Sequence, residues 1–170
     1  MRAYRTVLFG ALLGLATMPA TATVYLFHAD LDGLQEVPPN ASPGFGSVDL
    51  TLNDATGDVT VTSGSFNGLL GSTTASHVHG LANPGTNAGV LFPLTITLGA
   101  TSGTISGGGV LTAPNIAGMI AEQTYINVHT QLFSGGEIRG QVRLVPEPGS
   151  LLLLGFGAVI ALRRRSAGTS

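Results

Sequence analysis

Apolar and polar residues alternate along several short segments in the middle of the chain. Within residues 45–53, Val48, Leu50 and Leu52 fall on one face and polar residues fall on the other. A period of two is typical of a strand that buries one face. The turn sequence of residues 54–57 follows, so we expect a hairpin closed by a short loop.

Other segments show strand patterns of the same kind. They are residues 24–31, 58–62, 75–81, 90–98, 103–111, 123–130 and 136–145. One helical turn is expected at residues 114–122, with Pro114 near its start. About eight short strands joined by glycine-rich turns predict an all-β fold, either an antiparallel β-sandwich or a Greek-key barrel.

The N-terminus has a different pattern. Arg2 and Arg5 precede an apolar run at residues 6–18, and the small residues Ala20 and Ala22 follow. This order predicts a secretory signal peptide over residues 1–22, cleaved after about Ala22. The alternative is an uncleaved N-terminal anchor.

The C-terminus carries a second apolar run, residues 151–162, followed at once by three arginines. Twelve helical residues rise only about 18 Å, whereas a bilayer core is about 30 Å thick. We therefore expect a hydrophobic helix that is a marginal anchor, with its arginines on the cytoplasmic side.

A short proline motif, the hydrophobic helix and the arginine cluster stand in order at this end. The residues are Val145, Pro146, Glu147, Pro148, Arg163, Arg164 and Arg165. Together they resemble the PEP-CTERM sorting signal of Gram-negative bacteria, which would occupy residues 146–170. Glu147 would then belong to the recognition motif and would not be a catalytic acid.

The PEP-CTERM resemblance implies a route for the protein. It implies export, transient anchoring in the inner membrane, and processing near the motif by an exosortase-type enzyme. The final destination would be the cell envelope or the extracellular space of biofilm-forming cells. Exopolysaccharide or other surface proteins are then the expected partners.

Charge and composition narrow the chemistry of the middle segment. Between residues 23 and 145, two arginines stand against eight acidic residues, a formal charge of −6. Nucleic acid is excluded as a partner because phosphate binding requires a basic patch. The chain has no cysteine, which excludes disulfides, thiolate metal sites and cysteine nucleophiles. It also has no P-loop, dinucleotide-binding turn or nucleophile elbow, so we expect no catalytic residues.

Four motifs occur in order within residues 23–145. They are LDGLQEVPP (31–39), HVHGLANPGTNAG (77–89), YINVHT (125–130) and GGEIRGQV (135–142). This set resembles the CHRD domain, the chordin-type module of secreted proteins. The resemblance implies an extracellular β domain, for which we expect a non-enzymatic binding or structural role. We expect the first motif to form a chain corner.

The histidines are the main candidates for a binding site. His77 and His79 flank Val78, so they share the face opposite the core, and His129 shares the corresponding face of its own strand. Two imidazoles at this spacing, about 7 Å apart, could chelate copper or zinc if His129 supplied a third ligand. The alternative is structural: the histidines would hydrogen-bond to Glu137, Asn127 or loop carbonyls and hold residues 83–89.

The HVH pair is also similar to one on copper-zinc superoxide dismutase, a Greek-key barrel. The further metal histidines, the zinc aspartate and the disulfide of that enzyme have no clear match. His28 is the fourth histidine, and no pattern places it near the others. Glu137 and Arg139 are predicted to face solvent as an ion pair on their strand.

Overall fold

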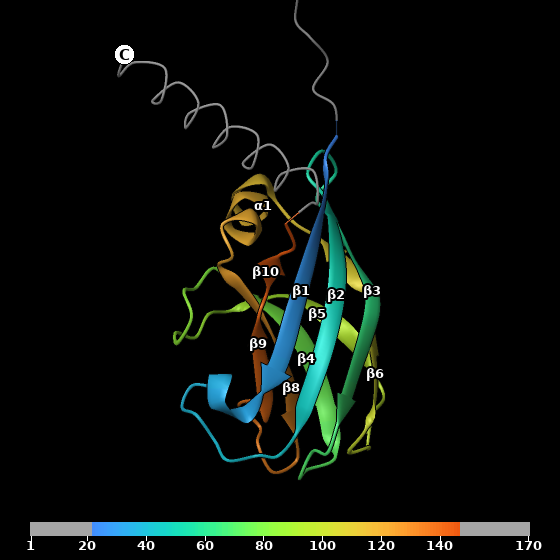
Figure 1. The fold of residues 1–170 in the computed structure, drawn as a ribbon, viewed down its shortest axis with the longest axis vertical. Helices are drawn as coiled ribbons and strands as arrows, with labels where there is room; N and C mark the ends of the chain where they lie inside the picture. Colours follow the sequence, from blue (N-terminus) through green and yellow to red (C-terminus); the bar gives the residue numbers. More distant parts are fainter. Residues whose placement is uncertain (1–21, 147–170) are drawn as a thin grey trace, which may run out of the picture.

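The computed structural model describes residues 22–146 (Figure 1). The predicted signal peptide up to residue 21, the C-terminal hydrophobic helix, Glu147, Pro148 and the arginine cluster lie outside the described residues. Within residues 22–146, no helix has the length and apolar character needed to cross a membrane.

Ten strands and one short α-helix make up the described chain. The strands are β1 (Val24–Asp32), β2 (Phe45–Asn53), β3 (Asp58–Asn67), β4 (Thr73–Gly80), β5 (Val90–Ile96), β6 (Gly103–Ser106), β7 (Gly108–Val110), β8 (Thr124–Thr130), β9 (Ile138–Gln141) and β10 (Arg143–Leu144). The helix α1 spans Ala113–Ile120 and has a proline in its first turn, as the sequence predicted. It lies at the end of the barrel where β1 begins (Figure 1).

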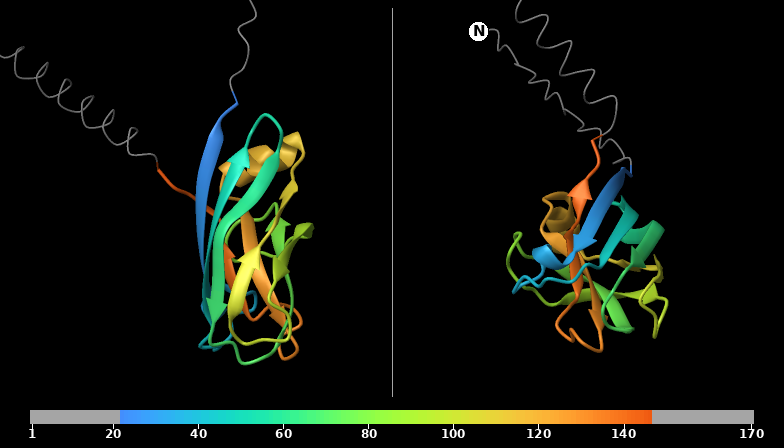
Figure 2. Two further views of the ribbon diagram at one scale, coloured as in Figure 1. Left: turned by 90° about the vertical axis from the view of Figure 1, so that its right-hand side faces the viewer. Right: turned by 60° about the horizontal axis from the view of Figure 1, so that its bottom comes forward.

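Eight of the strands close into an antiparallel barrel (Figures 1 and 2). Their order is β1-β2-β3-β6-β5-β4-β8-β9, and β9 pairs with β1 through Arg139 and Asp32. Because β3 lies beside β6 while β4, β5 and β6 follow one another, the topology is a Greek key. The all-β prediction is confirmed, and the barrel is the correct one of its two alternatives. The remaining two strands are extensions: β10 pairs with β1, and β7 pairs with β3.

The interior of the barrel follows the alternation in the sequence. Val48, Leu50 and Leu52 on β2 are at most 1% exposed, as predicted. The segment expected to be one strand over residues 103–111 is instead two strands, separated at Gly107. That glycine has a φ of +94°, a conformation that side-chain-bearing residues rarely adopt, and it ends β6 before β7 begins.

Barrel closure depends on one close backbone approach between β9 and β1. A Cβ atom on Gly140 would overlap the carbonyl oxygen of Asp30. Glycine at this position therefore lets the first and last strands of the barrel meet.

The first motif forms a corner, as expected. A 3-10 helix, η1 (Gly33–Gln35), follows β1 and is capped by Asp32, whose carboxylate accepts from the backbone N–H groups of Leu34 and Gln35 at 2.8 and 2.9 Å. The chain then runs across the outside of the barrel to β2.

The predicted solvent exposure of β9 is wrong. Glu137 is 0% exposed, Arg139 1% and Gln141 6%. Arg139 and Gln141 leave the barrel on the outer face, as the alternation indicates, and there they contact the loop of residues 81–89 and the η1 corner. Glu137 precedes β9 and is buried by other segments, with partners at residues 42, 70, 71 and 130. Glu137 and Arg139 also form no ion pair with each other; the ion pairs of the described residues are His28–Asp30, His28–Asp49 and Arg143–Glu122.

Candidate functional site

Three histidines come together on the outer face of the barrel. His77 and His79 lie on β4, and His129 lies on the neighbouring β8. The register places His79 opposite Tyr125, His77 opposite Asn127 and Ala75 opposite His129. The ring centroids are 4.9 Å apart for His77–His129, 5.6 Å for His77–His79 and 6.2 Å for His79–His129.

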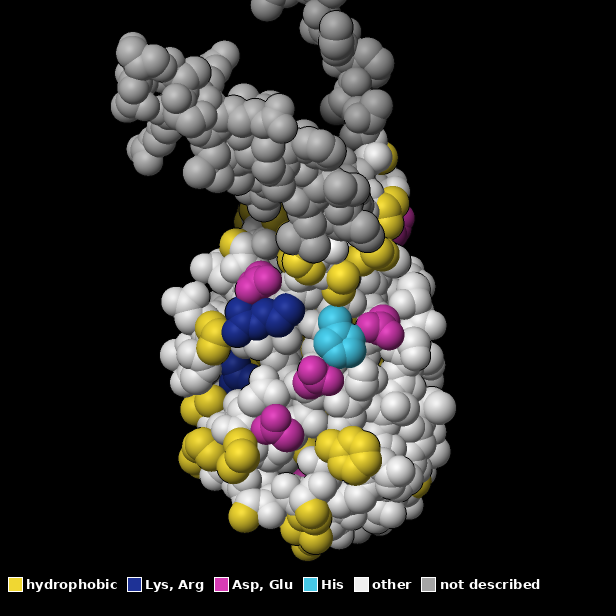
Figure 3. All heavy atoms as spheres, in the orientation of Figure 1, with side chains coloured by type: hydrophobic (Ala, Val, Ile, Leu, Met, Phe, Trp, Pro, Cys, Tyr) yellow, Lys and Arg dark blue, Asp and Glu magenta, His cyan; other side chains and the backbone are white. Residues whose placement is uncertain are grey.

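These three histidines are the group of possible metal ligands found within residues 22–146. One ring nitrogen from each lies within 4.8 Å of the others. His28 stands apart on β1, where its ring contacts Asp49 at 2.7 Å and Asp30 at 3.1 Å. Figure 3 shows one face of the protein, on which acidic, basic and histidine side chains lie close together.

Two loop carbonyls fix the protonation of two of the rings. His79 donates from Nδ1 to the Ala88 oxygen at 3.0 Å, and His129 donates from Nδ1 to the Ser134 oxygen at 2.9 Å. A carbonyl oxygen only accepts, so each Nδ1 carries the hydrogen and each Nε2 carries a free lone pair. Metal-bound histidines are held in the same way, by a hydrogen bond from the ring nitrogen that does not bind the ion.

The third ring lies against the second. His77 Nδ1 is 3.0 Å from His129 Nε2, and because the latter has a lone pair, His77 Nδ1 is the donor of this contact. For both nitrogens to bind one metal ion, the hydrogen on His77 Nδ1 would have to move to Nε2 of the same ring. With bonds of about 2.05 Å, two nitrogens at this separation would then subtend an angle of about 94° at the ion. Bonds of 2.1 Å span at most about 4.2 Å, so a separation of 4.8 Å requires the rings to close by roughly 0.6 Å.

Burial favours the neutral form of His77 and of His79. Burial lowers the pKa of His77 below 6.5, and the neighbouring His129 and His79 lower it further. Burial is also the main cause that lowers the pKa of His79, with smaller contributions from His129 and Arg139; the Ala88 carbonyl and Asn127 act in the opposite direction. At neutral pH both rings therefore have a lone pair available.

The loop of residues 81–89, called the roofing loop below, covers the histidine site. Side chains from the strands beneath it hold it in place. The Ala88 backbone accepts from His79, and its N–H donates to the Tyr125 hydroxyl at 3.1 Å. Arg139 donates to the Thr86 carbonyl at 2.8 Å and to the Asn87 side chain at 3.1 Å. His79 thus holds this loop, as the structural interpretation expected.

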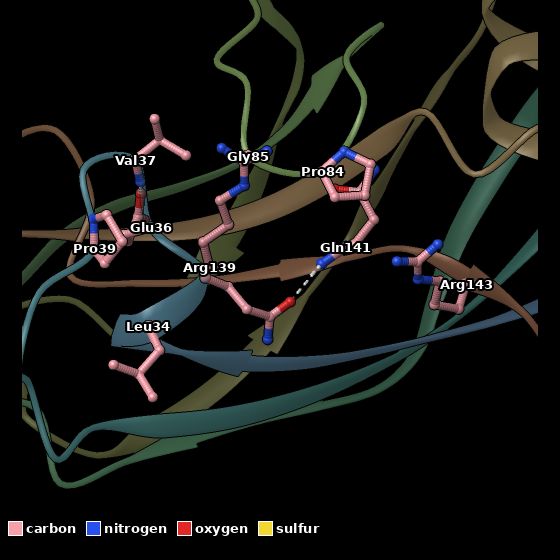
Figure 4. Close-up of a pocket in the computed structure, with 10 residues that line it drawn as sticks. Leu34, Glu36, Val37, Pro39, Pro84, Gly85, Arg139, Gln141 and Arg143 are labelled. Atoms are coloured by element: carbon pink, nitrogen blue, oxygen red, sulfur yellow. Dashed lines mark hydrogen bonds between the residues drawn. The ribbon is translucent and has the colours of Figure 1, made fainter.

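Arg139, Tyr125 and His79 form a continuous stack. The Arg139 guanidinium lies 3.4 Å from the Tyr125 ring centroid, and the Tyr125 and His79 rings are parallel within 5° at 4.8 Å. The stack links the histidines to a pocket of about 380 Å³. Figure 4 shows Arg139 and Gln141 in this pocket, between the η1 corner and Pro84 of the roofing loop.

Glu137 has a structural role that the sequence did not reveal. Its carboxylate accepts from Ser42 Oγ at 2.6 Å, Thr130 Oγ1 at 2.8 Å, and the backbone N–H groups of Leu70 and Gly71. Burial alone would raise the pKa of this carboxyl, but the hydrogen bonds outweigh burial and hold its pKa below 4.5. Glu137 therefore ties three loops together at one end of the barrel and is not a partner of the histidines.

The sorting motif begins where the barrel ends. Val145 donates its N–H to the Leu26 carbonyl at 2.8 Å, and Pro146 is the last described residue. The remaining sorting residues of the prediction lie outside the described part of the chain.

Two family models match the sequence. The CHRD domain model matches residues 27–142, and the PEP-CTERM protein-sorting motif matches residues 144–165. The sorting motif implies an exported protein that is anchored in a membrane before an exosortase-type enzyme processes it. Comparison with curated proteins and with solved structures gives no significant match.

Proposed function

Because the chain belongs to the CHRD-domain family, we propose that it is a non-enzymatic binding module of the cell envelope or extracellular matrix. It reaches that location through PEP-CTERM processing. Its ligand is a copper or zinc ion held by His77, His79 and His129.

The main observation in support of the metal site is that His79 Nε2 has no hydrogen-bond partner. This atom is buried and has no hydrogen-bond partner, while the opposite nitrogen of the ring is committed to Ala88. Leaving a buried polar atom unpaired is unfavourable, and such atoms are uncommon in native proteins. A metal ion bound at this lone pair removes the deficiency.

The donor set favours a transition metal. Imidazole nitrogen suits zinc, copper, iron and nickel, and the absence of carboxylates from the histidine group disfavours calcium and magnesium. Three protein ligands leave a coordination position open to solvent or to a further group.

Metal titration of the full chain, purified in mild detergent, tests the proposal. We expect one Cu²⁺ or Zn²⁺ per chain, and a loss of affinity of at least about 100-fold in His79→Ala because a ligand is removed. His28→Ala is the matched control, since it removes a barrel histidine that contacts two aspartates instead. Equal binding by both variants and the unmodified chain would reject the site.

The structural alternative makes a different prediction for the same variants. If the histidines only hold the roofing loop, His79→Ala lowers the thermal stability of the metal-free protein, and added metal changes the stability of neither protein. A metal site instead gives the unmodified chain a melting temperature that rises with metal concentration. The unpaired Nε2 favours the metal site, because holding the loop uses only Nδ1.

The location is tested separately by cell fractionation. The full chain should appear in the envelope and then outside the cell, whereas a chain ending at Val145 should not pass through the anchored stage. Identical distribution of the two chains would contradict processing at this motif. Exopolysaccharide and surface proteins remain the proposed partners, and the acidic domain supports contact with cationic or neutral surfaces.

A further inference from the structure

A second buried acceptor lies beside the histidines and also lacks a partner. Asn127 is 3% exposed, lies on β8 two residues from His129, and pairs in register with His77. Its side-chain nitrogen donates to the Gly135 carbonyl at 3.3 Å, which leaves Oδ1 on the other side of the amide. Oδ1 is buried and has no hydrogen-bond partner.

Asn127 Oδ1 and His79 Nε2 are the same kind of atom, a buried acceptor without a partner, on neighbouring strands. His79 donates from Nδ1 to one loop carbonyl, and Asn127 donates one hydrogen of Nδ2 to another. The atoms on the opposite sides, His79 Nε2 and Asn127 Oδ1, carry lone pairs and no hydrogen. Asn127 acts on His79 as a nearby hydrogen-bond acceptor, because an acceptor favours the protonated ring and so raises its pKa. Burial has the larger effect, and it lowers the pKa of His79. Two lone pairs cannot satisfy each other, and both are satisfied by a cation placed between them.

The described residues contain two other unpartnered buried side-chain atoms. They are Glu36 Oε1 and Thr124 Oγ1. Thr124 carries a hydroxyl that can donate as well as accept. Glu36 lies toward the pocket over Arg139, and its pKa is raised by burial, so it has a neutral form available. Only the His79–Asn127 pair combines fixed acceptors with a set of candidate ligands.

We propose that Asn127 Oδ1 is the fourth ligand of the metal site, which makes it an N₃O site selective for Cu²⁺ over Zn²⁺. This inference rests on the proposed function. Square-planar or tetragonal nitrogen and oxygen sets favour Cu²⁺, whereas Zn²⁺ takes tetrahedral sites. Once the hydrogen of His77 lies on its Nε2, the 3.0 Å separation of His77 Nδ1 and His129 Nε2 corresponds to an angle of about 94° at a shared ion. This angle is near the right angle of the former geometry and short of the tetrahedral one.

The test is to load the full chain with one equivalent of Cu²⁺ and to record its electron paramagnetic resonance and visible spectra. Asn127→Ala removes the oxygen, and we expect a changed copper hyperfine splitting and an affinity lower by at least about tenfold. Asn127→Asp keeps the shape of the side chain and adds charge, and we expect a changed spectrum and tighter Cu²⁺ binding. Asn67→Asp adds the same charge on the exposed part of β3 and should change neither quantity.

The possible results separate three claims: that Asn127 is a ligand, that the site prefers Cu²⁺, and that the three histidines bind a metal. If Asn127→Ala keeps the spectrum and affinity of the unmodified chain while His79→Ala loses binding, Asn127 is not a ligand, water satisfies its oxygen, and the three-histidine site stands. Zn²⁺ binding as tight as Cu²⁺ binding overturns the selectivity. If the unmodified chain binds neither ion, the proposed function and this inference both fail. Should Asn127→Ala not fold, Asn127→Asp decides, and an unchanged spectrum in that variant rejects the ligand.

Discussion

Replacing Glu137 with glutamine should destabilise the barrel strongly, although the two side chains have the same shape. The Glu137 carboxylate uses both oxygens: Oε1 accepts from Ser42 and Leu70, and Oε2 accepts from Thr130 and Gly71. Each oxygen therefore faces one backbone N–H, which cannot turn round to accept. Whichever way the glutamine amide is oriented, its NH₂ group points at a donor.

The magnitude follows from the hydrogen bonds lost. The backbone bond on that side disappears, whereas the hydroxyl there can rotate and accept from the new NH₂ group. A hydrogen bond to a charged group contributes about 1.5–3 kcal/mol, so we expect Glu137→Gln to lower the free energy of unfolding by at least about 1.5–3 kcal/mol. That is a substantial part of the roughly 5–15 kcal/mol that is usual for a whole domain, and it comes from one oxygen-to-nitrogen change.

Urea unfolding of residues 23–146, followed by circular dichroism near neutral pH, measures this difference. The matched control is Asp58→Asn, which removes the same charge from an exposed position where only Thr56 donates to the carboxylate. It should change the free energy by about 0.5 kcal/mol or less. A loss within about 1 kcal/mol for Glu137→Gln would refute the argument that these four bonds hold the loops.

The pH dependence provides a second check on the same variant. The pKa of Glu137 in the folded protein lies below its ordinary 4.5, so the unfolded chain takes up the proton first as the pH falls. The stability due to this carboxylate is present above about pH 4.5 and is lost as the pH falls toward the folded pKa. The difference between the unmodified protein and Glu137→Gln should therefore shrink below pH 4.5. The contribution of the raised pKa of Glu36 has the opposite sign and cancels in this comparison.

Three further outcomes follow from other contacts. Gly140→Ala should lower stability by about 1–3 kcal/mol, because its methyl group meets the Asp30 carbonyl, whereas Gly135→Ala enters open space and should be close to neutral in the same urea assay. Asp32→Ala should cost about 1 kcal/mol in thermal unfolding through loss of the η1 cap; no change would show that the corner forms without it. Metal affinity measured across pH should hold as the pH falls to 6.5 and decline only below it, since burial lowers the pKa of His79; a decline that begins above pH 6.5 would contradict that shift.

Strand positions could be predicted from the sequence because they depend on local alternation. Val48, Leu50 and Leu52 read as one face and line the core of the barrel. The break at Gly107 could not be predicted in the same way, since the glycines at residues 107–109 look alike in sequence and only one has a positive φ. The pairing of β3 with β6, which makes the fold a barrel, is a long-range contact that no local pattern encodes.

The outer face of β8 and β9 shows a second limit of the sequence. Alternation correctly placed Arg139 on the face away from the core, where it stacks on Tyr125, but it cannot say what covers that face. Two residues of opposite charge at this spacing read as a surface ion pair. In the fold, each is instead buried and satisfied separately, Glu137 by loop donors and Arg139 by loop acceptors and the Tyr125 ring.

Hydrogen bonds join the four motifs of the sequence to one another, so structural and functional explanations of their residues can be separated. Gln35 accepts from the Gln141 backbone, Asn87 accepts from Arg139, and Thr130 donates to Glu137, so contacts join every motif to another. For these residues, holding the loops on the barrel is a sufficient reason for their chemistry, because the contacts use their charged and amide groups. It is not sufficient at the histidines, where loop binding occupies one side of His79 and one side of Asn127 and leaves a buried acceptor on the other. A purely structural face would place a donor or an apolar atom there, and the pair of unused acceptors is therefore the part of the motif set that supports the proposed ligand.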